Sequence, residues 1–258
     1  MKALVLVVLL ACHSSPHETC GAPTTATAPA GVRTIQFPAG DGVTVTADVY
    51  APLPATAPFI VLFHQAGYSR GEYRTIAPRL NQLGFNAMAV DARSGEATGG
   101  VGNETAASAC KLGKPTNYVD AIADLKAAVA QARTLAQGKL LVWGSSYSSA
   151  LVLVLGTELH ADAVLSFSPG EYFDDQGKSK TWVAEHAKTL TVPVFITSAH
   201  SEAGEWAPIA AAIDPAKLTT FVPATAGHHG SSTLWPTQPD REASWTAVTA
   251  FLKPFVAP

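Results

Sequence analysis

One serine, a pair of histidines and two glutamates carry side chains that could perform nucleophilic catalysis together. Ser146 lies in the segment Gly144-Ser145-Ser146-Tyr147-Ser148, which follows a Gly-x-Ser-x-small pattern. A serine hydroxyl is a weak nucleophile until a base takes its proton. The pattern therefore implies a histidine and usually a carboxylate elsewhere in the chain.

The residues around Ser146 predict a sharp turn between a strand and a helix. Residues 140–143 form a short apolar run, and apolar residues recur at helical spacing after Tyr147. A serine at the tip of such a turn has a strained backbone and a projecting hydroxyl, and the next N–H faces any oxygen that becomes negative beside it. The alternative is a plain Gly-Ser turn before a core helix, because Ser148 stands in place of a second glycine.

The base is expected in Ala226-Gly227-His228-His229-Gly230, which follows the apolar run 218–222. His228 and His229 are adjacent, so only one of them can face Ser146. We favour His229, because Gly230 directly behind it permits a tight loop, and we keep His228 as the alternative.

The carboxylate that orients the histidine is expected after the apolar run 192–197. Glu202 and Glu205 follow this run, and Asp214 lies further along the chain. Glu205 lies at the start of the next predicted helix, where a carboxylate also has a structural role beside the positive end. We therefore favour Glu202 as the acid and keep Glu205 as the alternative.

Apolar strands and helical patterns alternate from Pro58 to the end of the chain. Strands are predicted over 59–63, 85–90, 140–143, 163–167, 192–197 and 218–222. Helices are predicted over 72–83, 118–136, the segment after Tyr147, 180–189, 205–213 and 241–252, and residues 92–115 are predicted to form an irregular loop. The alternation indicates a mainly parallel sheet covered on both faces, and residues 33–50 read as an antiparallel hairpin at its edge. No insertion is long enough for a large lid.

The loop after the predicted strand 59–63 reads His64-Gln65-Ala66-Gly67-Tyr68. In sheets of this kind, ligands bind at the C-terminal ends of the strands, where Ser146 also lies. We predict that the backbone N–H groups of Ala66 and Tyr147 form an oxyanion hole. His64 is interpreted as a structural residue of the loop, because the loop's role is to supply backbone N–H groups.

Over residues 32–258, the chain resembles an α/β-hydrolase of the dienelactone-hydrolase-like branch. Leu62-Phe63-His64-Gln65-Ala66-Gly67 resembles the family's His-Gly oxyanion loop, with Gln65 where glycine is commoner. Asp91-Ala92-Arg93-Ser94-Gly95 resembles its Asp-x-Arg-Gly-x-Gly turn, and His229-Gly230 resembles the end of its histidine loop. The order nucleophile, acid, histidine also fits the family. True dienelactone hydrolases have a cysteine nucleophile, so Ser146 implies ordinary ester chemistry instead.

The resemblance implies a serine hydrolase that cleaves small carboxylic esters through an acyl-enzyme, with Ser146, His229 and Glu202 as its triad. It implies neither a cofactor nor a metal, and we expect a monomer. One alternative is a serine peptidase of the prolyl-oligopeptidase type, although those enzymes generally carry a large extra domain. Another is a catalytically inactive surface or binding protein with the same fold.

Composition excludes some other classes of function. Hydrophobic residues make up 47% of the 258-residue chain and charged residues 14%, which favours a large buried core. The net charge of −3 and the absence of a Lys/Arg cluster give no electrostatic case for nucleic-acid binding. No His/Cys/Asp/Glu spacing suggests a metal site.

The N-terminus predicts export. Residues 1–11 have the form of a signal peptide, one lysine followed by an apolar run too short to cross a bilayer. Cys12 follows directly and resembles the lipidated cysteine of a bacterial lipoprotein, which would attach the protein to a membrane. Residues 12–31 are predicted to form a flexible tether before the catalytic domain, residues 32–258. We expect a periplasmic or cell-surface lipoprotein or, failing lipidation, a secreted protein; a cytoplasmic protein with an apolar N-terminus is the last alternative.

Two cysteines remain once Cys12 is set aside. Cys20 and Cys110 form an even pair in a chain predicted to reach an oxidising compartment, so a disulfide between them is one interpretation. Two free thiols are the alternative, because sequence spacing does not show that the two side chains meet.

Overall fold

The computed structural model describes residue 24 and residues 26–256 of the chain. The predicted signal peptide, Cys12, Cys20 and most of the predicted tether lie outside the described residues. The interpretations that depend on them therefore remain predictions.

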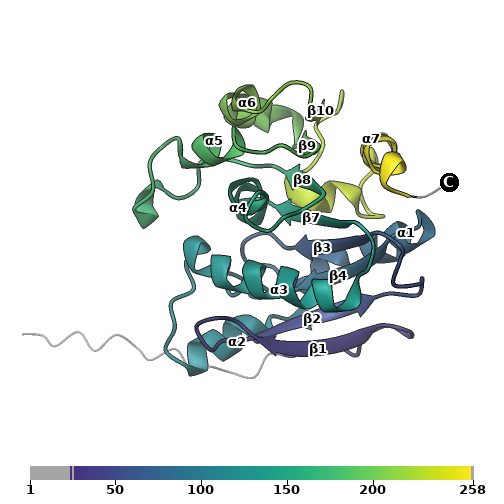
Figure 1. Cartoon of the computed structure of the whole chain (residues 1–258), viewed down its shortest axis with the longest axis vertical. Helices are drawn as coiled ribbons and strands as arrows, with labels where there is room; N and C mark the ends of the chain where they lie inside the picture. Colours follow the sequence, from purple (N-terminus) through teal and green to yellow (C-terminus); the bar gives the residue numbers. More distant parts are fainter. Residues whose placement is uncertain (1–23, 25, 257–258) are drawn as a thin grey trace, which may run out of the picture.

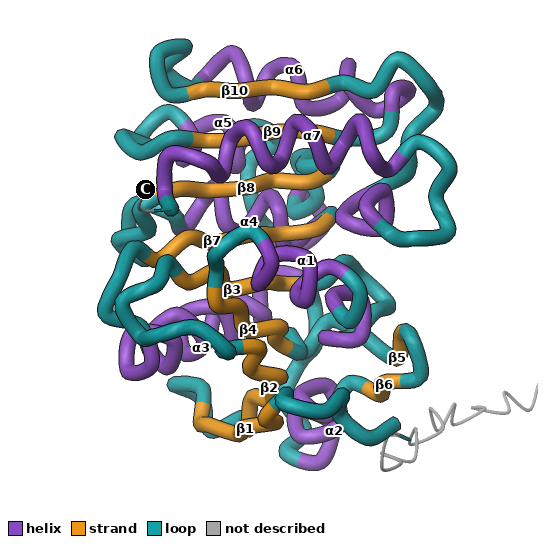
Figure 2. The backbone as a smooth tube through the Cα atoms, turned by 90° about the vertical axis from the view of Figure 1, so that its right-hand side faces the viewer, coloured by secondary structure: helices purple, strands orange, loops and turns teal. Residues whose placement is uncertain are grey.

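Within the described residues, eight strands form one sheet in the order β1-β2-β4-β3-β7-β8-β9-β10 (Figure 2). β2 pairs antiparallel with β1 and with β4, and all other neighbouring strands are parallel. The strands of this sheet are β1 (Arg33–Pro38), β2 (Thr44–Tyr50), β3 (Phe59–Phe63), β4 (Asn86–Val90), β7 (Leu140–Ser145), β8 (Ala163–Phe167), β9 (Val194–Thr197) and β10 (Leu218–Phe221). The predicted N-terminal hairpin and mainly parallel sheet are confirmed.

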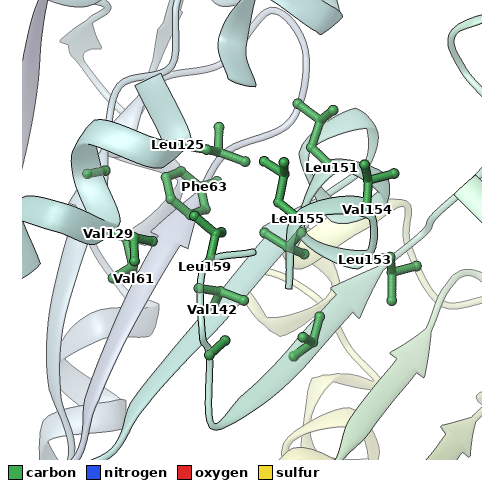
Figure 3. Close-up of a cluster of buried hydrophobic side chains, with 14 of the residues drawn as sticks. Val61, Phe63, Leu125, Val129, Val142, Leu151, Leu153, Val154, Leu155 and Leu159 are labelled. Carbon is green, nitrogen blue, oxygen red and sulfur yellow. The ribbon is translucent and has the colours of Figure 1, made fainter. Parts of the chain in front are cut away.

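The buried strands send alternate side chains into two separate cores. In β3, Phe59, Val61 and Phe63 join one hydrophobic cluster, while Ile60 and Leu62 join the other. This alternation follows from the two-residue period of a strand. Because both faces of β3 are buried, its sequence is apolar throughout and not alternating. Figure 3 shows part of the first cluster, where side chains of β3 and β7 meet those of two helices.

Helices cover both faces of the sheet (Figure 1). The first core receives side chains from α3 (Ile122–Leu135), α4 (Tyr147–Leu155), α5 (Trp182–Ala187) and α6 (Ala203–Ala212). The second receives them from α1 (Ile76–Gln82) and α7 (Arg241–Leu252) on the opposite face. None of the described segments forms an inserted lid over the strand ends. No helix among residues 26–256 is long and apolar enough to cross a membrane.

The predicted irregular loop over residues 92–115 is partly wrong, because it contains a short hairpin and a helix. The hairpin consists of β5 (Ala97–Thr98) and β6 (Val101–Gly102), and the helix is α2 (Glu104–Lys111). The side chain of Asn103 caps α2 by accepting a hydrogen bond from the Ala106 N–H at 2.8 Å. Its sequence, ETAASACK, contains no large apolar residue, so no core-facing helix was predicted.

The predicted helix over residues 72–83 also differs from the structure. Its beginning is a separate 3-10 turn, η1 (Arg70–Tyr73), and α1 starts only at Ile76. Ser69 begins η1, and its side chain accepts a hydrogen bond from the Gly71 N–H at 3.2 Å. Glu72 therefore lies in a tight turn behind the loop that follows β3, and not on an exposed helix face.

The segment that follows β4 is fixed by a buried arginine. Arg93 is 2% exposed, and its guanidinium bonds both oxygens of Asp124 and both oxygens of Asp41. Asp124 belongs to α3 and Asp41 to the turn between β1 and β2. Arg93 thus joins the end of a central strand to a helix and to the hairpin, which makes this side of the strand ends rigid.

Candidate active site

Ser146 occupies a strained turn between β7 and α4. Its backbone angles are φ 58° and ψ −125°, a region that residues with a side chain rarely adopt. Gly144 makes this turn feasible, because a Cβ at that position would lie 2.3 Å from the carbonyl oxygen of Ser148. The elbow, residues 144–148, therefore has the strand-to-helix geometry expected of a nucleophilic serine.

Ser148 explains why the elbow tolerates a serine in place of the second glycine. Its hydroxyl lies 2.8 Å from the carbonyl oxygen of Phe63 in the neighbouring strand β3 and accepts a hydrogen bond from the Ser145 N–H at 2.9 Å. The side chain is completely buried. Ser148 thus fits the close approach of helix and strand and adds polar contacts that fasten the elbow to β3.

Glu202 and His229 meet in the loops that follow β9 and β10. Oε1 of Glu202 lies 2.7 Å from Nδ1 of His229, which leaves Nε2 as the ring nitrogen available to a reacting group. The hydrogen bond to Glu202 raises the pKa of His229 above its ordinary value, and the Glu202, Glu72 and Glu205 charges add to this against the effect of burial. Burial alone would raise the pKa of Glu202, but hydrogen bonds from His229 and Ser168 bring it below the ordinary value. In this pair the proton is therefore favoured on the imidazole of His229, and the carboxylate of Glu202 stays ionised.

Ser168 connects this pair to the strand that follows the elbow. It lies directly after β8 with φ 57°, and its hydroxyl donates to Oε2 of Glu202 at 2.6 Å. The Ser168 hydroxyl oxygen also accepts a hydrogen bond from the Gly230 N–H at 2.9 Å. Tyr172 donates to the Ser168 carbonyl at 2.8 Å, and the Ser146 N–H donates to the carbonyl of Phe167, the residue before Ser168, at 2.8 Å. Ser146 thus lies within one shared contact network with Glu202.

The structure separates the alternatives left open by the sequence. The pKa of Asp240 is lowered mainly by the hydrogen bond from Thr225 and least by the charge of His228, and none of the described residues forms a hydrogen bond with the His228 ring. Glu205 is an exposed residue of the first turn of α6, as expected for a helix-end role. Asp214 accepts a hydrogen bond from the Ala216 N–H in the turn before β10. The geometry therefore favours His229 and Glu202.

The oxyanion loop, residues 64–68, presents the N–H of Ala66 in a fixed direction. Nε2 of His64 accepts a hydrogen bond from the Ala92 N–H at 2.9 Å, so Nδ1 carries the ring proton and donates to the Gln65 carbonyl at 2.8 Å. A planar trans peptide directs the Ala66 N–H opposite to that carbonyl. Among the described residues, none accepts from the N–H of Ala66 or of Tyr147, the first residue of α4.

His64 has a structural role in this arrangement. Its side chain is completely buried, and burial lowers the pKa of its imidazole to about 4 despite hydrogen bonds with the backbone of Gln65 and Ala92. A ring that stays neutral and has both nitrogens engaged cannot act as a base at neutral pH. The interpretation of His64 as a loop-shaping residue agrees with these contacts.

A cavity of about 400 Å³ lies beside the oxyanion loop. Its lining includes Ala66, Gly67, Ser94, Glu96, Thr116 and Tyr118. The Tyr118 ring stacks on the ring of Tyr147 at 4.5 Å between centroids, so one wall of the cavity is continuous with the elbow.

Metal-binding geometry is not found in the part of the chain that the structure describes. No group of three or more His, Cys, Asp or Glu side chains there could hold an ion.

Cys110, near the end of α2, is disulfide-bonded. Its pairing with Cys20 stays a prediction, because Cys20 lies outside the described residues.

Sequence reasoning missed three residues that support this site, namely Ser168, Glu72 and Ser231. Ser168 could have been found, because it ends the strand next to the elbow strand and therefore lies in the same row of strand ends. Glu72 and Ser231 carried no such signal. Both form hydrogen bonds with Ser145, which lies 73 and 86 positions away from them, and Glu72 also accepts one from the Gln65 N–H.

Comparison with known proteins supports the fold. No protein-family model and no curated protein matches the chain. An esterase of Pyrococcus furiosus, Pf2001, superposes with a TM-score of 0.65 at 19% identity, over 88% of this chain and 93% of that one. XC6422 of Xanthomonas campestris, a serine hydrolase without a lid, gives 0.60 at 14% identity, over 91% and 99%. An acylaminoacyl peptidase of Pyrococcus horikoshii gives 0.59 at 12% identity, over 87% of this chain and 41% of that one. The chain therefore has the α/β-hydrolase fold.

Proposed function

We propose that the protein is a serine hydrolase that cleaves small carboxylic esters through an acyl-enzyme. The observation that carries the proposal is the 2.7 Å hydrogen bond between Glu202 and His229 in a network shared with the strained elbow of Ser146. A carboxylate, an imidazole and an elbow serine in chain order Ser, Glu, His are the components that acyl transfer requires. The α/β-hydrolase fold adds support, because structures named as esterases share it.

In the proposed reaction, Ser146 Oγ bonds to the acyl carbon while its proton passes to Nε2 of His229. Glu202 stabilises the imidazolium through Nδ1. The N–H groups of Ala66 and Tyr147 donate to the oxyanion that forms, which is usually the largest contribution in such sites. The bond from the acyl carbon to the alkoxy oxygen then breaks, and His229 gives its proton to the departing alcohol.

Water completes the cycle. His229 takes a proton from the water molecule as its oxygen bonds to the acyl carbon. The bond to Ser146 Oγ then breaks, the carboxylic acid leaves, and His229 returns the proton to Ser146. These steps balance without any group beyond water and the chain's own residues.

The proposal is tested by labelling with a fluorophosphonate, which reacts with activated serines. We expect wild-type protein to be labelled, with the adduct mapped to Ser146 by mass spectrometry, and the Ser146→Ala variant to remain unlabelled. A panel of p-nitrophenyl esters of increasing acyl length then defines the substrate range. Labelling at another residue, or no labelling of a folded wild-type protein, would contradict the proposal and favour a catalytically inactive binding protein.

A serine peptidase is the second candidate, because one of the structural neighbours is an acylaminoacyl peptidase. This chain covers only 41% of that protein. Peptide p-nitroanilides with blocked and free N-termini distinguish the two activities. Turnover of peptides faster than of p-nitrophenyl acetate would replace the esterase proposal.

A further inference from the structure

Glu72 is a buried carboxylate that the proposed mechanism does not use. It lies in η1 and is completely buried. None of the ion pairs among the described residues includes it. Burying a carboxylate without a cationic partner is costly unless hydrogen bonds compensate. Its contacts therefore indicate what the carboxylate does.

Both carboxylate oxygens of Glu72 accept hydrogen bonds from the site's own loops. Oε2 accepts from the backbone N–H of Gln65 at 2.9 Å, and Oε1 accepts from the hydroxyl of Ser145 at 2.8 Å. Gln65 directly precedes Ala66 in the oxyanion loop, and Ser145 directly precedes Ser146 in the elbow. One side chain thus joins the two segments that must face each other across the reacting carbonyl.

The histidine loop, residues 226–230, ends at the same network. The N–H of Ser231 donates to the Ser145 hydroxyl oxygen at 2.8 Å. That contact uses the oxygen as an acceptor and directs the Ser145 hydrogen toward Glu72. The space is also tight, because a Cβ at Gly230 would lie 2.4 Å from the Ser145 hydroxyl oxygen and 2.6 Å from the Gln65 side-chain oxygen.

We infer that Glu72 is a positioning residue of the proposed esterase, whose ionised carboxylate ties the oxyanion loop to the elbow. The inference rests on the proposed function. Glu72 fixes the N–H of Gln65, and His64 fixes its carbonyl. With Gln65 held from both sides, the next N–H, that of Ala66, keeps the direction that an oxyanion donor needs before substrate arrives.

The ionisation of Glu72 has a measurable signature near neutral pH. Burial raises the pKa of Glu72 to about 7, opposed by the hydrogen bonds from Gln65 and Ser145 and by the charge of His229. The other titratable groups whose charges interact with Glu72 are Tyr73 and Tyr147. Protonated Glu72 would no longer accept from both donors. The active form therefore has Glu72 ionised and His229 neutral, and activity should rise with pH through two coupled ionisations.

The decisive variant is Glu72→Gln in the full-length protein. The amide oxygen can still accept from the Gln65 N–H, but the amide nitrogen cannot accept from Ser145. We expect kcat for p-nitrophenyl acetate to fall roughly 10- to 100-fold with KM nearly unchanged, because the hole acts on the transition state. The acid limb of log(kcat/KM) against pH should change from a slope above one to a slope of one. It should also move to lower pH, because His229 loses a neighbouring negative charge.

Glu185→Gln is the matched control. Glu185 is an exposed residue of α5 that bonds Ser179 and Thr181, away from the loops named above. It should keep wild-type kcat and slope. Wild-type kcat in Glu72→Gln, or an acid limb that keeps the wild-type slope, would overturn the inference while leaving the esterase proposal intact. A wild-type protein that hydrolyses no ester and takes no fluorophosphonate would overturn both.

Two further measurements keep the inference testable if Glu72→Gln folds poorly. Ser145→Ala removes one donor to the carboxylate, which should raise the pKa of Glu72. The acid limb of this variant should therefore lie at higher pH than that of wild type. The kcat of Ser145→Ala should fall much less than that of Ser146→Ala, because Ser145→Ala removes only a hydrogen bond. In wild type alone, the acid limb must have a slope above one. A wild-type slope of one would contradict the inference, and so would an acid limb of Ser145→Ala at the same pH as that of wild type.

Discussion

The hydroxyl of Ser168 donates to Oε2 of Glu202 at 2.6 Å, while Oε1 of the same carboxylate contacts His229. Glu202 is therefore held through both oxygens and cannot rotate away from the imidazole without breaking a charge-assisted hydrogen bond. Ser168 also accepts from the Gly230 N–H, so one serine fixes the acid and the loop that carries the base.

Ser168→Ala should lower kcat roughly tenfold, the effect expected when a carboxylate loses one good hydrogen bond. The lost donor should also raise the pKa of Glu202. Ser179→Ala is the matched control, because Ser179 donates to a glutamate too, the exposed Glu185. Steady-state kinetics with p-nitrophenyl butyrate provide the measurement. Equal kcat in the Ser168 and Ser179 variants would show that Ser168 does not position the acid.

Ser146→Ala should abolish hydrolysis of p-nitrophenyl acetate and butyrate, by roughly 10⁴-fold or more, because no other hydroxyl occupies the elbow tip. Ser145→Ala should cost far less, since its side chain is buried behind the elbow. Circular dichroism checks that both variants are folded. A Ser146→Ala protein as active as wild type would rule out this nucleophile.

His229→Asn should be close to inactive, and His228→Asn should keep most of the activity. The reason is that His229 is hydrogen-bonded to Glu202, whereas none of the described residues forms a hydrogen bond with the His228 ring. Both side chains are half-buried, so the pair is matched for position and exposure. If His228→Asn is the lethal change, the assignment of the base is wrong.

Glu202→Gln should reduce kcat by several orders of magnitude with little change in Tm, because an amide cannot stabilise the imidazolium. In wild type the pKa of His229 is raised, mainly by the hydrogen bond to Glu202, so kcat/KM should rise with pH at values above the ordinary range of a histidine. Glu202→Gln should move this rise to lower pH. Glu205→Gln is the control. Should Glu205→Gln lose turnover instead, the acid lies three residues further along.

The raised pKa of His229 also determines how the stability of the folded protein changes with pH. A histidine whose pKa is higher in the folded protein is stabilising below its unfolded pKa of about 6.5. That contribution is lost as the pH rises through the higher pKa of the folded state. Wild type should therefore lose its stability advantage over His229→Asn as the pH rises from 6 to 9, which thermal melts at several pH values can measure.

Export is tested in the native host. If Cys12 carries a lipid, full-length protein should partition into Triton X-114 detergent, and Cys12→Ser should move it to the aqueous phase. Cys110→Ser, expressed in parallel, controls for the loss of any cysteine. If wild-type protein stays in the aqueous phase, the remaining expectation is a secreted protein without a lipid anchor.

Much of the fold could be predicted because buried strands leave an unambiguous pattern. The predicted strands at Phe59–Phe63 and Ala163–Phe167, and the helix at Arg241–Leu252, coincide with those of the structure. Each is apolar or periodic along its whole length. The helix Glu104–Lys111 was missed because its stability comes from the Asn103 cap and from packing on β2, neither of which shows in periodicity.

The candidate site was predictable where chemistry depends on one residue and its neighbours, and not where it depends on distant pairs. Ser146 was found from a strand, a glycine and a helix in sequence. The choice between His228 and His229 required knowing which ring meets a carboxylate 27 positions away. The proposed role of Glu72 could not be predicted from the sequence, because it depends on a completely buried hydrogen bond with Ser145.

Among the described residues, β10 is one of the two edge strands of the sheet. It pairs there with β9 alone, and its side chains are at most half-buried. Edge elements open with less free energy than central ones. The proposed base follows this edge strand, whereas the proposed nucleophile follows β7, the strand of Trp143 at the sheet's centre. During urea denaturation, hydrolysis should therefore disappear before the fluorescence of the buried Trp143 and Trp245 changes. The proposed activity would then be lost when one edge of the sheet opens, while most of the core is still folded.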